Sequence, residues 1–163
     1  MAKRLLSKPI TIKEANLFVE QFHRHHRPTS RNCGRWAISA IDTETNQIVG
    51  VAICANPVSA TYMDGFTLEV TRLCVKSDAP LGTPSFLLRK CSKIWQLMGG
   101  KKILTYTLDY ESGASLRGAG WEKVSTVNPH NNWRNKSNMD GKERDSLDIY
   151  QFKKYRWELK LIS

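Results

Sequence analysis

Residues 103–121 constrain the fold of this chain more than any other segment. A short apolar run at 103–108 predicts a strand, and a compact helix predicted at 112–119 follows it and stops at Gly120-Trp121. Polar and reactive side chains crowd the junction between the two elements: Asp109, Tyr110, Glu111, Ser112, Ser115 and Arg117. Ligands in open α/β sheets bind at the C-terminal ends of strands. The sequence therefore places a ligand site at this junction.

The length and composition fit one globular domain. The chain has 163 residues, and 40% of them are hydrophobic, which is enough to bury a sizeable core. No window approaches the roughly 20 apolar residues that a membrane span needs. Residues 1–6 contain no apolar signal-peptide core. We therefore expect a single domain over residues 1–163, located in the cytoplasm and without a membrane partner.

The cysteines point to a structural role. Cys33, Cys54, Cys74 and Cys91 form no C-x-x-C pair, and three of them have apolar neighbours. A reduced thiol in such surroundings behaves as a small hydrophobic side chain. A zinc site built from these cysteines and the histidines of residues 23–26 is the weaker alternative, because the ligands are scattered singly.

The charge of the chain is strongly basic and uneven. The formal net charge is +10. Residues 1–35 hold eight Lys and Arg against two Glu, whereas residues 36–75 hold one Arg against four acidic residues. Because Lys and Arg release condensed counterions when they bind phosphates, a polyanion such as nucleic acid is a natural partner. On charge alone, the alternative is equally open: the basic surface serves only to keep the protein soluble.

The pattern along the chain predicts alternating helices and strands. Thr11 and Glu14 form a capping box that starts a helix running to about residue 23, and Pro84 suits the first turn of a second helix. A polar turn joins the first two strands as a hairpin. The predicted strands are 36–41, 47–55, 68–75, 103–108, 121–127, 147–152 and 155–161, and the later helices are 84–98 and 112–119. Residues 128–146 are polar and are expected to form an exposed excursion.

This order of elements carries a first resemblance. A helix, a hairpin and a strand precede a glycine-containing loop and a long helix, and a strand and a short helix ending at Gly-aromatic follow. The order resembles the GNAT acyltransferase superfamily. The resemblance implies an α+β fold whose mixed central sheet splays between two central strands, here 68–75 and 103–108, and is flanked by helices. An acyl-CoA would lie in the splay, with its pyrophosphate at the next helix N-terminus. The implied cofactor-binding positions are Leu73, Val75, Gly82, Thr83 and Ser85.

Four motifs narrow the resemblance. They are His25-His26-Arg27-Pro28, the run TLEVTRL at 67–73, the strand TYTL at 105–108 with ESGASLR at 111–117, and Arg156-Trp157-Glu158. Together they resemble the Mom-like DNA-modification proteins of bacteriophages over roughly residues 11–161. This implies an enzyme of the infected host cell's cytoplasm that converts adenine in phage DNA to N6-methylcarbamoyl-adenine, as a shield from host restriction. It also implies DNA and acetyl-CoA or another acyl-CoA as partners, and leaves an iron ion open.

Two positions depart from the general GNAT pattern. The pyrophosphate loop usually reads Arg/Gln-x-x-Gly-x-Gly/Ala, but residues 79–85 contain one glycine and two prolines. A tyrosine that protonates the departing thiolate often stands four residues before the Gly-aromatic pair, and here that residue is Leu116. Another donor is therefore needed.

Several side chains near the predicted crevice could supply the chemistry. An exocyclic adenine amine is a poor nucleophile, so a base or a metal is required, and Glu111 could accept the proton. An equally open alternative is a structural role, in which Glu111 lies in the first turn of the helix and its negative charge is stabilised by the helix dipole. Ser112, Ser115 or Tyr106 could donate to a thiolate or hold the carbonyl, and Ser112 is equally plausible as a helix cap.

Arg72 lies in an apolar strand, where an arginine must either be paired or face a ligand. The family resemblance favours the ligand-facing role. In the structural alternative, Arg72 forms an ion pair with Glu69 or Glu111. His25 and His26 suit proton transfer or a metal, against the alternative of a solvated helix end. With Asp109 or Glu111, one of them, His25 first, could bind a ferrous ion.

The DNA-binding residues expected from the charge pattern are Arg24, Arg27, Arg31 and Arg35, together with the loop that carries Trp133 and Arg134. Trp133 could stack on a base. Two other functions stay open: a GNAT N-acetyltransferase of a protein or small amine, and a non-catalytic DNA-binding module. The oligomeric state is open as well, with a homodimer as one option.

Overall fold

A seven-stranded mixed sheet forms the centre of the protein. The computed structural model describes residues 4–22, 28–29, 32–128 and 153–162. The strands are β1 (Leu5–Ile10), β2 (Trp36–Asp42), β3 (Gln47–Ala55), β4 (Thr67–Val75), β5 (Lys102–Leu108), β6 (Glu122–Val127) and β7 (Lys154–Lys160). The helices are α1 (Ile12–Phe22), α2 (Thr83–Leu97) and α3 (Ala114–Gly118), with a 3-10 turn, η2 (Ala60–Tyr62). No helix of the described residues is long and apolar enough to span a bilayer.

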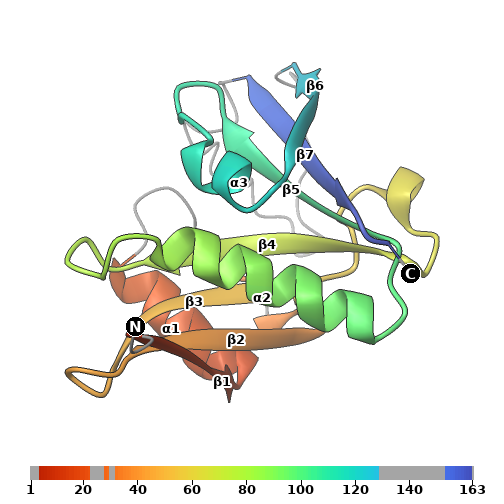
Figure 1. The fold of residues 1–163 in the computed structure, drawn as a ribbon. Helices are drawn as coiled ribbons and strands as arrows, with labels where there is room; N and C mark the ends of the chain where they lie inside the picture. Colours follow the sequence, from red (N-terminus) through yellow and green to blue (C-terminus); the bar gives the residue numbers. More distant parts are fainter. Residues whose placement is uncertain (1–3, 23–27, 30–31, 129–152, 163) are drawn as a thin grey trace, which may run out of the picture.

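The sheet order is β1-β2-β3-β4-β5-β7-β6. Every neighbouring pair is antiparallel except β4 and β5, which are parallel. Among the described residues these two strands pair at three positions alone: Thr67 with Lys102, Leu68 with Ile103, and Glu69 with Leu104. Beyond that point they diverge, so Figure 1 shows β4 separating from the group of β5, β7 and α3. The sheet therefore has a fork between its fourth and fifth strands.

Helices cover both faces of the sheet. On one face α2 and α3 pack over a core that includes Leu68, Leu87, Ile103 and Trp157. On the other face α1 packs over β2, β3 and β4 through a smaller cluster that includes Val19. The alternating strand residues supply both clusters, because successive side chains of a strand point to opposite faces.

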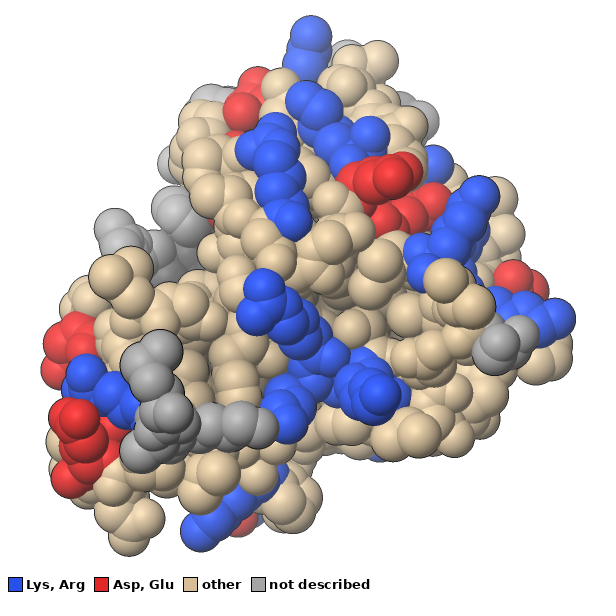
Figure 2. Space-filling model, viewed as in Figure 1, with Lys and Arg blue, Asp and Glu red and all other residues tan. Residues whose placement is uncertain are grey.

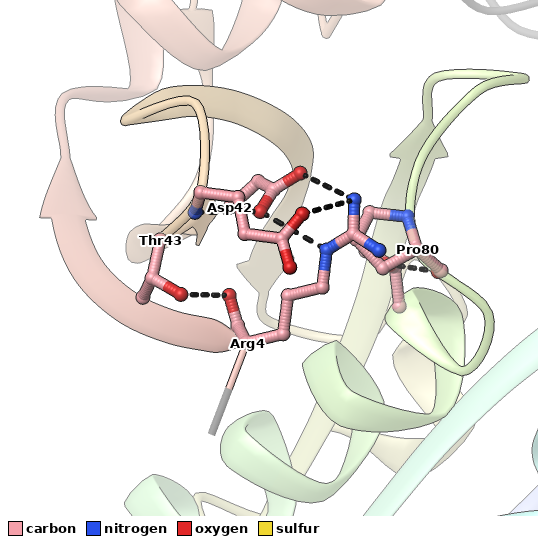
Figure 3. A network of polar contacts seen from close by, with 6 residues as sticks. Arg4, Asp42, Thr43 and Pro80 are labelled. Atoms are coloured by element: carbon pink, nitrogen blue, oxygen red, sulfur yellow. Dashed lines mark hydrogen bonds and ion pairs between the residues drawn. The ribbon is translucent and has the colours of Figure 1, made fainter. Parts of the chain in front are cut away.

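Strand β1 was not expected from the sequence. Its residues are largely exposed and include Pro9, which is tolerated because β1 is an edge strand. The Arg4 guanidinium donates to both carboxylate oxygens of Asp42 at 3.2 Å, and Thr43 Oγ1 donates to the Arg4 carbonyl at 2.9 Å (Figure 3). The hydrogen bonds from Arg4 lower the pKa of Asp42. These polar contacts add to the ladder with β2 and to the packing of Leu5 and Ile10 against the two cores.

Most of the predicted elements are confirmed, within one or two residues at each end. The Thr11 hydroxyl accepts the Glu14 N–H at 3.1 Å, which is half of the predicted capping box. All four cysteines are free, and Cys54, Cys74 and Cys91 are buried, as expected. The predicted strand at 147–152 and nearly all of the excursion at 128–146 lie outside the described residues.

The start of α3 is fixed by a close approach that only glycine permits. Gly113 has φ +70°, and a Cβ there would lie 2.3 Å from Trp157 Cζ2. Gly113→Ala should therefore destabilise the fold by about 2–4 kcal/mol, since overpacking adds to left-handed strain. Urea denaturation measures this cost. Gly120→Ala is the control, because Gly120 also has positive φ but has open space around it; it should lose only about 1 kcal/mol. Equal losses in the two variants would contradict the close approach to Trp157.

Candidate active site

The fork between β4 and β5 results from two local features. The register of β3 against β4 shifts between Ile53 and Cys54, which leaves Thr71 as an extra residue on β4. Just beyond the last ladder pair, Thr105 Oγ1 donates to the Val70 carbonyl at 2.8 Å. A side-chain hydrogen bond therefore takes the place of the next main-chain hydrogen bond between the strands. Arg72 and Tyr106 lie beyond the last ladder pair. The predicted parting of the main chain beside these two residues is therefore confirmed.

Glu69 lies at the vertex of the fork. It forms the last ladder pair with Leu104, and only 6% of its surface is exposed. Its Oε1 accepts the Val58 N–H at 3.1 Å. Burial raises the pKa of Glu69 to about 7, while the Val58 N–H and the charges of Arg72 and Lys154 act in the opposite direction. A carboxyl with a pKa near neutrality can take and return a proton at physiological pH.

Tyr106 lies one strand away on β5, on the same side of the sheet as Glu69. Burial, and after it the negative charge of Glu69, raises the pKa of Tyr106 to about 12. Its hydroxyl therefore stays protonated at neutral pH and acts as a hydrogen-bond donor. The neighbouring Lys154 on β7 has its pKa lowered by burial, and the charge of Glu69 limits that effect. The fork thus gathers one carboxyl, one phenol and two cations, Arg72 and Lys154.

Tyr62 joins the site from the connection between β3 and β4. The Arg156 Cζ lies 4.8 Å from the centre of the Tyr62 ring, and the Lys102 Nζ lies 5.4 Å from it. Both cations also approach Glu158 Oε1 at 3.4 Å. These contacts place an aromatic ring from one side of the fork against charged groups from the other side.

The expected donor-binding residues border the fork, but two of their hydroxyls are engaged within the protein. Thr83 Oγ1 donates to the Pro80 carbonyl at 2.6 Å, and Ser85 Oγ donates to the Ser115 carbonyl at 3.0 Å. Gly82 precedes the first turn of α2 with φ +85°, and a Cβ at this position would meet no neighbouring atom within 4 Å. The expected positions Leu73 and Val75 are partly buried and pack against the core beneath α2.

An acyl-CoA fits these surroundings. In the described part of the chain, β4 and β5 do not pair with each other beyond Glu69 and Leu104, and a pantetheine chain would lie between their facing edges. The first turn of α2 begins at an open Gly82, and helix N-termini favour phosphates. The Thr83 and Ser85 hydroxyls are engaged elsewhere, the Thr83 N–H donates to the Pro80 carbonyl at 3.2 Å, and Pro84 has no N–H. At this turn the Ser85 N–H, rather than a hydroxyl, would therefore donate to the pyrophosphate.

The residues after β5 shape the end of that strand. The Glu111 Oε1 accepts the Leu108 N–H at 2.9 Å, and the Glu111 N–H donates to the Leu108 carbonyl at 3.0 Å. Ser112 Oγ accepts the Ala114 N–H at 3.3 Å, but the N-cap of α3 is Gly113, so this bond is a local turn contact and not the helix cap weighed from the sequence. Leu116 is buried in the core. Catalytic roles for Glu111, Ser112 and Ser115 stay predictions, and the structure adds a structural contact for each.

The other predicted site residues are only partly placed. His25, His26, Arg24, Arg27, Arg31, Trp133 and Arg134 lie outside the described residues. Arg35 is exposed, and its Cζ lies 5.0 Å from the centre of the Trp95 ring on α2. Within the described part of the chain no three His, Cys, Asp or Glu side chains gather as a metal site would require, so Asp109 has no such cluster around it.

Sequence reasoning missed Glu69 as a proton-accepting group and missed Tyr62 and Lys154 altogether, and it used Arg156 only as part of a family motif. One signal was present, because Glu69 is an acidic residue in the otherwise apolar run LEVTRLCV. Tyr62 carried no comparable signal, since its role depends on how the connection before β4 folds across the sheet.

The surface in front of α2 is cationic. Helix α2 contains three basic residues, Arg89, Lys90 and Lys93, and no acidic one. All three are exposed. Figure 2 shows Lys and Arg side chains running across the middle of this face, where Figure 1 places α2. Such a surface attracts anionic ligands toward the fork.

The raised pKa of Glu69 predicts a pH-dependent stability. In the unfolded chain the carboxyl ionises near 4.5, but in the folded protein it ionises near 7. Folding is therefore penalised progressively as the pH rises from 4.5 to 7, and the penalty is constant above 7. Glu69→Gln removes this penalty, so its stability relative to the parent should grow by about 2–3 kcal/mol between pH 4.5 and pH 8. Urea denaturation at the two pH values measures the difference. The control Glu122→Gln, at an exposed position, should show no such growth, and a flat difference for Glu69→Gln would contradict its burial as an ionisable group.

The fold matches those of known acetyltransferases. No protein-family model matches the chain, and no curated protein matches it. The ribosomal-protein-S18-alanine N-acetyltransferase of Escherichia coli is 11% identical with a TM-score of 0.65, over 98% of this chain and 95% of that one. The IAA acetyltransferase of Bacillus cereus is 13% identical with a TM-score of 0.68, over 96% and 99%. A putative GNAT-family acetyltransferase of Desulfovibrio desulfuricans is 14% identical with a TM-score of 0.63, over 97% and 99%. These likenesses show the fold, and the chain has the α+β fold of the GNAT acetyltransferases, as the sequence predicts.

Proposed function

We propose that the protein is an N-acyltransferase that moves an acyl group from acyl-CoA to an amine, with Glu69 as the general base. The observation that carries this proposal is a buried carboxyl with a pKa of about 7 at the vertex of an open strand fork. Apolar surroundings and a nearby phenol and cations are typical of sites tuned for proton transfer. The fold supports the same reaction class.

The donor side of the site is proposed from geometry and charge. When bound, the CoA thioester supplies an activated acyl group. The pantetheine arm would lie along β4 at Leu73 and Val75, beyond the last pair of β4 with β5, and the first turn of α2 after Gly82 would receive the phosphates. The Bacillus subtilis acetyltransferase of similar fold, solved with CoA, is 13% identical with a TM-score of 0.64. That likeness supports acyl-CoA as the donor.

Proton movements follow from the pKa values of the two central groups. As the amine nitrogen bonds to the acyl carbon and the carbon–sulfur bond breaks, the amine proton passes to the Glu69 carboxylate. Tyr106 keeps its proton, since its pKa is raised to about 12, and donates a hydrogen bond to the oxygen or sulfur that gains negative charge. Coenzyme A then leaves as a thiolate, which accepts the hydrogen bond from Tyr106; this differs from the proton transfer for which Leu116 has no group.

The acceptor is proposed to be the N6 amine of adenine in DNA, the atom that the Mom-like proteins modify. The resemblance in sequence supports this, together with the net charge of +10 and the cations Arg72 and Lys154 beside Glu69. A cationic site disfavours an ammonium acceptor and favours a neutral amine on an anion. Because the amine is hidden in a base pair, the base must be flipped or single-stranded. The proposed DNA clamp consists of Arg35, the arginines of residues 24–31 and the loop that carries Trp133.

Three further expectations stay untested: an iron ion, a location in the host cell and a homodimer.

One assay tests the donor, the base and the acceptor together. The full chain is incubated with acetyl-CoA and a single-stranded oligonucleotide that contains adenine, and the products are read by mass spectrometry. An oligonucleotide without adenine, an alanine-terminated peptide and a polyamine serve as competing acceptors. We expect acetyl transfer to the adenine oligonucleotide alone. Glu69→Gln should lower kcat/KM by about 10²–10⁴, the usual contribution of a general base.

The controls separate the alternatives. Glu122→Gln should retain the parent rate, since Glu122 is exposed on β6. Transfer to the peptide or polyamine with an inert oligonucleotide would reject adenine and keep the acyltransferase. DNA binding without any transfer, and with no thermal stabilisation by acetyl-CoA, would instead identify a non-catalytic DNA-binding module.

A further inference from the structure

The connection between β3 and β4 covers the Glu69 side of the fork. Pro57 is fully buried, and the next residue, Val58, donates its N–H to Glu69 Oε1 at 3.1 Å. The Val58 side chain is 69% exposed, so Val58 contributes its main chain rather than its side chain to the site. Residues 56–66 therefore lie against the proposed base through their backbone.

Tyr62 ties this connection to the opposite side of the fork. It ends the 3-10 turn η2, whose N–H groups at Tyr62 and Met63 bond back to Ser59 and Ala60. Its ring lies 4.8 Å from Arg156 Cζ on β7 and 5.4 Å from Lys102 Nζ on β5, both within the range of a cation–π contact. Because β4 and β5 pair at three positions only, a contact of this kind between their two sides restrains the connection at the fork.

The cations that hold Tyr62 are themselves fixed. Arg156 Nε and Lys102 Nζ each lie 3.4 Å from Glu158 Oε1, and Glu158 is largely buried, with 13% of its side chain exposed. Arg156 and Glu158 occupy positions opposite Tyr106 and Leu104 in the ladder between β5 and β7. The ring of Tyr62 therefore contacts two cations on β5 and β7 that are ion-paired with Glu158.

We propose that Tyr62 is a positioning residue, which holds residues 56–66 over Glu69 so that water stays away from the carboxyl and the Val58 N–H stays aligned with it. The catalytic importance of this role rests on the proposed function of Glu69. The restraint itself does not, because it concerns the environment of one carboxyl in the free protein. Tyr62 acts through the connection and not by touching a reactant.

The sign of the effect follows from the groups that face Glu69. Arg72 on β4 and Lys154 on β7 lower its pKa, the Val58 N–H lowers it as well, and burial raises it more than these three together. Tyr106 on β5 is the remaining titratable neighbour and is neutral at pH 7. If residues 56–66 loosen, water reaches the Glu69 carboxyl, and burial then raises its pKa less. The pKa of Glu69 should then fall.

The experiment follows the Glu69 carboxyl directly in the full-length protein. Glutamate is labelled with ¹³C at the carboxyl carbon, the signals are titrated by NMR from pH 4 to pH 9, and Glu69→Gln assigns the resonance. The parent midpoint should lie near 7. In Tyr62→Leu the midpoint should fall by about one pH unit or more, as expected when a buried carboxyl is hydrated. An unchanged or higher midpoint would overturn the proposal.

Matched variants make the result specific. Tyr62→Phe keeps the ring and should retain the parent midpoint. Phe66→Leu removes another aromatic ring of the same connection, one that lies 4.8 Å from Lys101 Nζ, and should also leave the midpoint unchanged. A shift in Phe66→Leu equal to that in Tyr62→Leu would overturn the specific role of Tyr62. Tyr62→Met, which keeps more volume, replaces Tyr62→Leu if that variant does not fold.

This titration is independent of turnover. If acetyl transfer is absent but the midpoint falls in Tyr62→Leu, the proposed function fails and the restraint stands. If transfer occurs and the midpoint does not move, the proposed function stands and the role of Tyr62 is rejected.

Discussion

The early end of the ladder between β4 and β5 determines the rest of this structure. Three residue pairs hold the two strands together, and the extra residue Thr71 then turns β4 away. A continuous ladder would satisfy the main-chain groups beyond Glu69 and Leu104 and would close the sheet. Because it stops, β4 diverges from β5, β7 and α3 beyond this point (Figure 1). The proposed donor site lies where the two strands part.

The same fork explains the properties of Glu69. A carboxyl at the last pair is shielded by strands on both sides and by the connection before β4, so it is desolvated. Arg72 and Lys154 limit this penalty without removing it. The balance leaves a group that can change its protonation state near pH 7, whereas full compensation by an ion pair would fix the carboxylate as a structural anion. Burial and catalysis are thus linked at one residue.

The sequence predicted the architecture well because its strongest signals are local. The apolar runs at 47–55 and 103–108, Pro84 at the start of α2 and the Gly-Trp pair after α3 all depend on neighbouring residues. Strand β1 escaped prediction because LLSKPI has no alternating apolar pattern and contains Pro9, and because its pairing with β2 joins residues about 30 to 40 positions apart. Glu69, Tyr62 and Lys154 escaped for the same reason, since three separate segments bring them together. Glu111 stood out in the sequence, yet its carboxylate binds the Leu108 N–H.

The claim that the fork receives acyl-CoA is tested most directly by mapping backbone amide signals by NMR while acetyl-CoA is added to the full-length protein. Binding in the fork should shift the amides of residues 72–75 on β4, 106–108 on β5 and the first turn of α2, and should leave those of β1 unchanged. Saturable shifts confined to other parts of the protein, or no shifts at millimolar acetyl-CoA, would contradict it.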